Sequence, residues 1–147
     1  MSDLLQEISN NMTELSNRIS DAETQRQHDW DRIDRLEQAR LQIDSSQTMV
    51  HNAIEAVDKI INESQGSTAK WVGSRKQAAW VDLQRIRDKL RAKEVAHGDL
   101  GIFIEGEKAK IAFNIDDLEN LINGFNSDII NLQNQETSEI MRLQNGS

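Results

Sequence analysis

The residue types that could do chemistry are few and scattered in this chain of 147 residues. The three histidines are His28, His51 and His97. No two of them have the i, i+3 or i+4 spacing that places two metal ligands on one helix face. Asp116 and Asp117 form an acidic pair, but 25 acidic residues make such neighbours common by chance. No phosphate-binding glycine loop, nucleophile elbow or HExxH pattern occurs. We therefore expect no enzyme, no metal and no cofactor.

Composition points to long helices. The chain has no Cys, which excludes disulfides, thiolate nucleophiles and Cys-ligated zinc, and it has no Pro, which would kink a helix. Charged residues make up 29% and the mean hydropathy is −0.66, so we expect no membrane span. The N-terminal residues lack the basic and apolar regions of a conventional signal peptide.

The charge is acidic overall but unevenly distributed. The net charge of −8 disfavours nucleic acid and anionic membrane as partners. Residues 66–97 carry 8 basic against 3 acidic side chains, whereas both flanking segments are acidic. We interpret this basic segment as a solvated helical face that is partly paired with an acidic neighbour.

Apolar residues recur at three- and four-residue steps, which predicts helices over about 3–64 and 75–144. The first stripe includes Trp30 and is interrupted at Arg26, Asp29, Arg40 and Gln47. Gly66 suits a helix C-terminus, so we expect a turn near 65–74. The second stripe includes Ile86, and its glycines predict a kink or break near 98–106. The expected fold is a single all-α domain over 1–147, a long, coiled-coil-like antiparallel helical hairpin.

Adjacent apolar residues make the stripes wider than one seam between two helices requires. Examples are the doublets Ile60-Ile61, Leu121-Ile122 and Ile129-Ile130. A second apolar face should therefore be buried by another helical protein, by a second copy, or by the chain's own C-terminal segment. The candidate partner interface consists of Ile111, Ile115, Leu118, Ile122, Phe125 and Ile129.

The tripeptide Trp71-Val72-Gly73 falls in the expected turn. Its Trp could cover the end of the seam, and Gly73 permits a tight backbone before the second helix. A Trp-x-Gly turn in an acidic helical hairpin without Pro or Cys resembles the WXG-motif proteins of bacterial type VII secretion. With both arms long, the chain looks most like the helical partners of LXG-domain toxins of Gram-positive bacteria.

The resemblance implies a function and a route. It implies a chaperone or targeting factor that pairs with a toxin's LXG domain or another small helical protein. It also implies an export signal of the form aromatic-x-x-x-acid, which Phe113 and Asp117 fit. The protein would then be cytoplasmic before export and reach the cell envelope or the medium through type VII secretion. The alternative is a structural or tethering coiled-coil protein that forms homo-oligomers.

Overall fold

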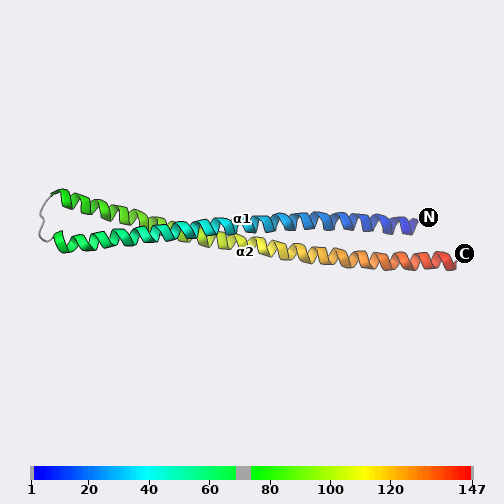
Figure 1. The fold of residues 1–147 in the computed structure, drawn as a ribbon. Coiled ribbons are helices and arrows are strands. Elements are labelled where there is room, and N and C mark those ends of the chain that lie inside the picture. The colour runs from blue at the N-terminus through cyan, green and yellow to red at the C-terminus, as the bar shows by residue number, and fades with distance from the viewer. Residues whose placement is uncertain (1, 69–73, 147) are drawn as a thin grey trace. The chain divides into compact units, whose positions relative to one another are not determined.

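The computed structural model of the chain describes residues 2–68 and 74–146, and the side chains of residues 2–63 and 79–146. Two helices make up this part of the chain, α1 (Asp3–Thr68) and α2 (Ser74–Asn145), and it contains no strand (Figure 1). The predicted all-α helical hairpin is confirmed. Within the described residues, neither helix has a stretch apolar enough to cross a membrane.

The outer ends of both helices have local hydrogen bonds that define them. The Ser2 hydroxyl accepts a hydrogen bond from the backbone N–H of Leu4 at 3.2 Å, so Ser2 is the N-cap of α1. Asp3 follows in the first turn, where a negative charge interacts favourably with the helix dipole. At the end of α2 the N–H of Gly146 donates to the carbonyl of Arg142 at 2.8 Å. These contacts satisfy backbone groups that the helices leave unpaired.

Glycine does not interrupt either helix. α1 continues through Gly66 and ends at Thr68, and α2 begins at Ser74, so both helix ends fall within the segment 65–74 in which the turn is expected. α2 likewise continues unbroken through Gly98, Gly101 and Gly106, and no described glycine has a positive φ. A glycine costs a helix only about 1 kcal/mol relative to alanine, which the many flanking residues of a long helix offset.

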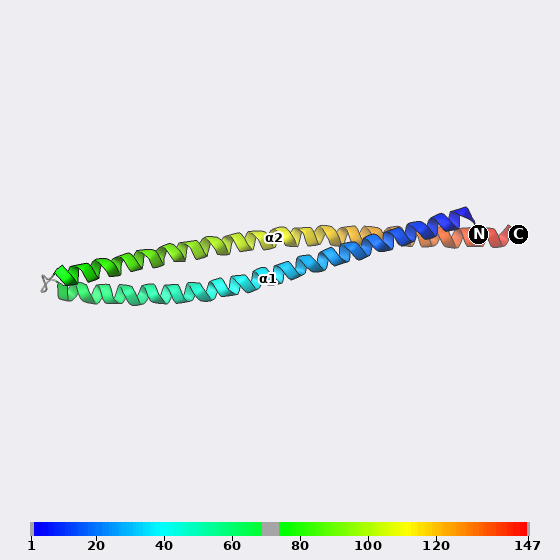
Figure 2. The same cartoon turned by 90° about the horizontal axis from the view of Figure 1, so that it is seen from above.

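The chain divides into two compact units, each made of antiparallel segments of α1 and α2. Unit 1 is Met1–Asp34 with Lys108–Ser147, and unit 2 is Arg35–Glu107. In unit 1 the blue and the orange-to-red segments lie side by side in both views (Figures 1 and 2). The Ser2 hydroxyl there donates to Oε1 of Glu139 at 3.1 Å, which connects the N-cap of α1 to α2. The single domain expected over 1–147 stays a prediction.

Both helices bury one stripe with strictly alternating steps of three and four residues. In α1 this stripe consists of the buried or half-buried residues Leu5, Ile8, Met12, Leu15, Ile19, Ala22, Arg26, Asp29, Ile33, Leu36, Arg40, Ile43, Gln47, Val50, Ile54, Val57 and Ile61. In α2 it consists of Trp80, Leu83, Arg87, Leu90, Glu94, His97, Gly101, Ile104, Lys108, Ile111, Ile115, Leu118, Ile122, Phe125, Ile129, Leu132, Glu136 and Glu139. We call these positions the seam. This alternation averages 3.5 residues, which is the repeat of a coiled coil.

The seam follows this repeat even where it must accept a polar residue. Asp29 is 2% exposed, whereas the neighbouring Trp30 is 46% exposed. Gln25 donates from Nε2 to Oδ1 of Asp29 at 3.2 Å, and Nη1 of Arg32 lies 3.7 Å from the same oxygen. Partners from its own helix therefore compensate the burial of this carboxylate.

Candidate interaction surface

In unit 2 polar side chains also connect the two helices. Gln47 of α1 donates from Nε2 to the backbone carbonyl of Glu94 at 3.3 Å, and its Oε1 lies 3.2 Å from Nδ1 of His97. His51 of α1 lies beside Glu94, with its Nδ1 3.5 Å from Oε2 of that residue. Each contact requires its partner at one particular turn, so together they define the register of α1 against α2 in this unit.

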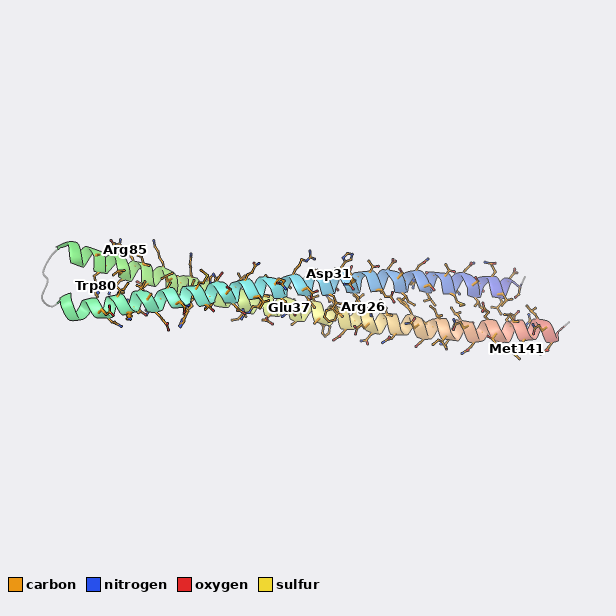
Figure 3. All side chains as sticks on the ribbon, in the orientation of Figure 1. Arg26, Asp31, Glu37, Trp80, Arg85 and Met141 are labelled. Carbon is orange, nitrogen blue, oxygen red and sulfur yellow. The ribbon has the colours of Figure 1, made fainter. Side chains whose placement is uncertain are left out.

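The expected pairing of basic residues with an acidic neighbour also occurs in unit 2. Asp58 of α1 lies 3.5 Å from Nη1 of Arg87 through Oδ1 and 3.5 Å from Nη2 of Arg91 through Oδ2. Arg87 is a seam residue, and its side chain is only 23% exposed. By contrast Arg85, which Figure 3 labels, has a side chain that is 72% exposed. Part of the basic segment thus holds the two helices together and part of it faces solvent.

Arg40 and Gly101 form a complementary pair in the same seam. The guanidinium of Arg40 fills the space that a Cβ at position 101 would occupy. Nε of Arg40 also lies 3.4 Å from Oδ1 of Asp44, one turn along α1. The missing side chain at Gly101 therefore provides the room in which a long cation can lie across α2.

The opposite side of α2 in unit 2 is apolar and exposed. Val95 is 64% exposed, Ile102 is 73% exposed and Phe103 is 61% exposed. With about 100° of rotation per residue, these positions point away from the seam. We define the outer face of α2 as the exposed residues Ala92, Val95, Ala96, Asp99, Ile102, Phe103 and Gly106. Between Ala92 and Gly106 the seam of α2 includes the polar residues Glu94 and His97 beside the buried Ile104, while the outer face is apolar except for Asp99.

Two glycines widen the access to this face. A Cβ at Gly98 or at Gly106 would meet nothing within 4 Å, so neither glycine is required by packing inside the chain. They lie four residues to either side of Ile102, on one ridge of the helix. Each weakens α2 by about 1 kcal/mol relative to alanine. A surface without side chains at these positions allows the backbone of another helix to approach closely.

The residues of the predicted turn motif, Trp71 and Gly73, lie outside the described residues. The residues of the candidate export signal, Phe113 and Asp117, lie in the described part of α2. Phe113 is 67% exposed, and Asp117 is also exposed one turn further along α2 in unit 1. The two side chains therefore lie on one face of the helix and are accessible to a receptor.

The stripe predicted as a partner interface lies in the seam of unit 1. Ile111, Ile115 and Ile122 are 3%, 2% and 5% exposed. Leu118, Phe125 and Ile129 are half-buried. The stripe occupies the three- and four-residue steps that pack against α1, so a second protein could reach its isoleucines only by displacing α1. The intact hairpin offers the apolar residues outside the seam instead.

The apolar doublets divide between these two environments. Ile61 is 2% exposed and Ile122 is 5% exposed, whereas their neighbours Ile60 and Leu121 are each 47% exposed. Ile130, the outer member of the third doublet, is 56% exposed. One residue of each doublet packs in the seam and the other projects from it, which accounts for the extra apolar width of the sequence.

An open groove with a volume of about 410 Å³ lies in unit 1. It is lined by Leu15 and Leu132 and by the polar or charged residues Asn11, Glu14, Arg18, Asp128, Asn131 and Gln135. Within the described residues, no three His, Cys, Asp or Glu side chains are grouped so that they could hold a metal ion.

Comparison with protein-family models, with curated proteins and with solved structures found no match. The function is therefore inferred from the chain's own surfaces and from its sequence.

The sequence analysis does not single out the outer face. The glycines there predict a kink or break, and Val95, Ile102 and Phe103 lie outside the predicted stripe. A signal was present nonetheless. Val95 and Ile102 are seven residues apart and run parallel to the seam repeat, but at a different phase.

Proposed function

We propose that this protein is a non-enzymatic helical partner protein that binds a second helical protein through the outer face of α2. The observation that carries the proposal is the exposure of Val95, Ile102 and Phe103 on a helix whose seam is already filled by α1. Exposed apolar residues grouped on one helix face are typical of protein interaction sites. An amphipathic helix could bury it by laying its apolar residues along α2.

The class of partner that we propose comes from the Trp71-x-Gly73 resemblance. The partner is the helical LXG domain of a toxin, or a small WXG-like protein, and the role is that of a chaperone or targeting factor for type VII secretion. The hairpin would bind its partner in the cytoplasm, cover the partner's apolar helix and present the pair for export. Phe113 and Asp117 are the proposed export signal, and their common exposed face supports this assignment.

The second candidate is a structural or tethering protein that forms homo-oligomers. The continuous three-and-four repeat from Leu5 to Ile61 favours it, because long coiled coils share this repeat. The described seam, however, is occupied within one chain. A homo-oligomer would therefore also have to use residues outside the seam, and the two candidates differ in what covers the outer face.

The test is affinity capture of the tagged full chain from a lysate of the source organism, followed by mass spectrometry. Ile102→Glu places a charge on the outer face, and Met49→Glu is the matched control because Met49 is 70% exposed on α1 in the same unit. Circular dichroism should show that both variants remain helical. The proposal expects the native chain and Met49→Glu to recover an LXG-type or small helical protein that Ile102→Glu loses. Equal recovery by all three chains would overturn the binding surface, and recovery of the tagged chain's own copies alone would favour the homo-oligomer.

A further inference from the structure

Asp99 lies at the centre of the outer face of α2. Val95 precedes it by one turn, and Ile102 and Phe103 follow it by one turn, so its carboxylate is surrounded by exposed apolar side chains. A helix that covers these residues also removes Asp99 from water. An ionised carboxylate is costly to bury without a cation or other hydrogen-bond donors. The occupant must therefore supply a compensating group at this point.

A second copy that covers this face with its own outer face does not supply that group. The outer face extends from Ala92 to Gly106, and Asp99 is its midpoint. An antiparallel two-fold pairing that covers the whole face places Asp99 opposite the same residue of the copy, and so does a parallel pairing in register. Two carboxylates opposed in a desolvated interface repel each other. The charge at the centre thus opposes self-pairing through this face.

We infer that the outer face of α2 binds a helix of a different protein that carries an Arg or Lys at the centre of its apolar stripe, opposite Asp99. The inference rests on the proposed function, and it specifies the chemistry of the partner. Gly98 and Gly106, four residues to either side of Ile102, provide room for large apolar residues of that helix beside Ile102. Asp99 selects the partner by charge, while Ile102 and Phe103 supply the apolar contact.

The experiment uses the full chain and two synthetic helical peptides with one apolar stripe. The peptides are identical except that the central residue of the stripe is Arg in one and Glu in the other. Binding is measured by fluorescence anisotropy for the native chain, Asp99→Lys and Ile102→Glu. We expect the native chain to bind the Arg peptide at least roughly tenfold more tightly than the Glu peptide, with the preference reversed for Asp99→Lys. Ile102→Glu should weaken binding of both peptides.

The outcomes separate this inference from the proposed function. If both peptides bind the native chain equally and Ile102→Glu weakens both, the face binds helices but Asp99 does not select them, which overturns the inference alone. If neither peptide binds the native chain, both the inference and the proposed function are overturned.

Sedimentation equilibrium provides an independent readout. Asp99→Leu completes the apolar face, so this variant should self-associate while the native chain does not. A native chain that dimerises, with the dimer lost in Ile102→Glu, would identify the occupant as a second copy and overturn the inference.

Discussion

The guanidinium of Arg40 lies where Gly101 has no side chain, so a cation and a glycine share one layer of the seam. Both residues are suboptimal for stability at their positions. Glycine lowers helix propensity, and a partly desolvated guanidinium is often no more stabilising than an apolar side chain of similar volume. The pair instead suits the choice of register, because a side chain at position 101 would have to displace the guanidinium of Arg40.

The double variant Arg40→Leu with Gly101→Ala should therefore be more stable than the native chain. We expect the free energy of unfolding to rise by about 1–3 kcal/mol, from the helix propensity of alanine and from an apolar layer in place of the cation. Urea unfolding followed by circular dichroism measures the change. Arg40→Leu alone is the control for the cation. A lower stability of the double variant would mean that Arg40 contributes more to the seam than its volume suggests.

Gly98 and Gly106 should show the opposite relation between stability and binding. Replacing both by Ala adds side chains that meet nothing within 4 Å, so the free energy of unfolding should rise by about 1–2 kcal/mol. The same Cβ atoms would hold a docked helix further away, and affinity for the captured partner should fall. Thermal unfolding and quantitative pull-down test the two effects on one protein. An unchanged affinity would remove the two glycines from the binding surface.

Much of the fold followed from the sequence, because three- and four-residue spacing specifies a helix face whatever covers it. The seam was harder to assign. Trp30 was expected in the stripe but is exposed beside the buried Asp29, and Ile86 is 48% exposed beside the half-buried Arg87. In both places the regular repeat, and not the hydrophobicity of a single residue, decides which residue is buried in the seam. Periodicity alone also could not tell a face buried by α1 from one left for a partner, because both are apolar at helical spacing.

Ile122 and Ile130 should differ sharply in their effect on folding. Ile122 is 5% exposed in the seam of unit 1, so Ile122→Ala should lower the free energy of unfolding by about 2–5 kcal/mol. Ile130 is 56% exposed, and its replacement by Ala should change stability by less than about 0.5 kcal/mol. Chemical unfolding of both variants gives the comparison. Equal effects would contradict the seam in this unit, and the loss of stability also makes Ile122 unsuitable for testing a partner interface.

Glu139 should make unit 1 sensitive to acid. Its hydrogen bond from Arg142, together with the one from Ser2, holds the pKa of its carboxyl below the ordinary value of 4.5, although desolvation acts in the opposite direction. Nη2 of Arg142 lies 2.6 Å from Oε1 and Nε lies 2.9 Å from Oε2. Because the pKa is lower in the folded state, the stabilisation is complete above the unfolded pKa and is lost as the pH falls through the folded pKa.

Glu139→Gln tests this contribution. The variant should be less stable than the native chain at neutral pH, and the difference should shrink as the pH falls below 4.5. Urea midpoints measured between neutral pH and pH values below the folded pKa provide the comparison, with Glu14→Gln as a control on an exposed i, i+4 pair with Arg18. A difference that stays constant over this range would show that the ionisation of Glu139 does not contribute to stability.

Phe113 and Asp117 should be required for export but not for folding. Both lie exposed on one face of α2, so Phe113→Ala and Asp117→Asn remove recognition groups without opening the seam. If the proposed type VII signal is correct, each variant should remain in cells and lose most of its signal in the culture medium. Ile130→Ala, which also shortens an exposed apolar residue of α2, should be exported normally. Normal export of the Phe113 and Asp117 variants would show that this pair is not the signal, whereas retention of all three variants would indicate that export depends on the general apolar surface of α2.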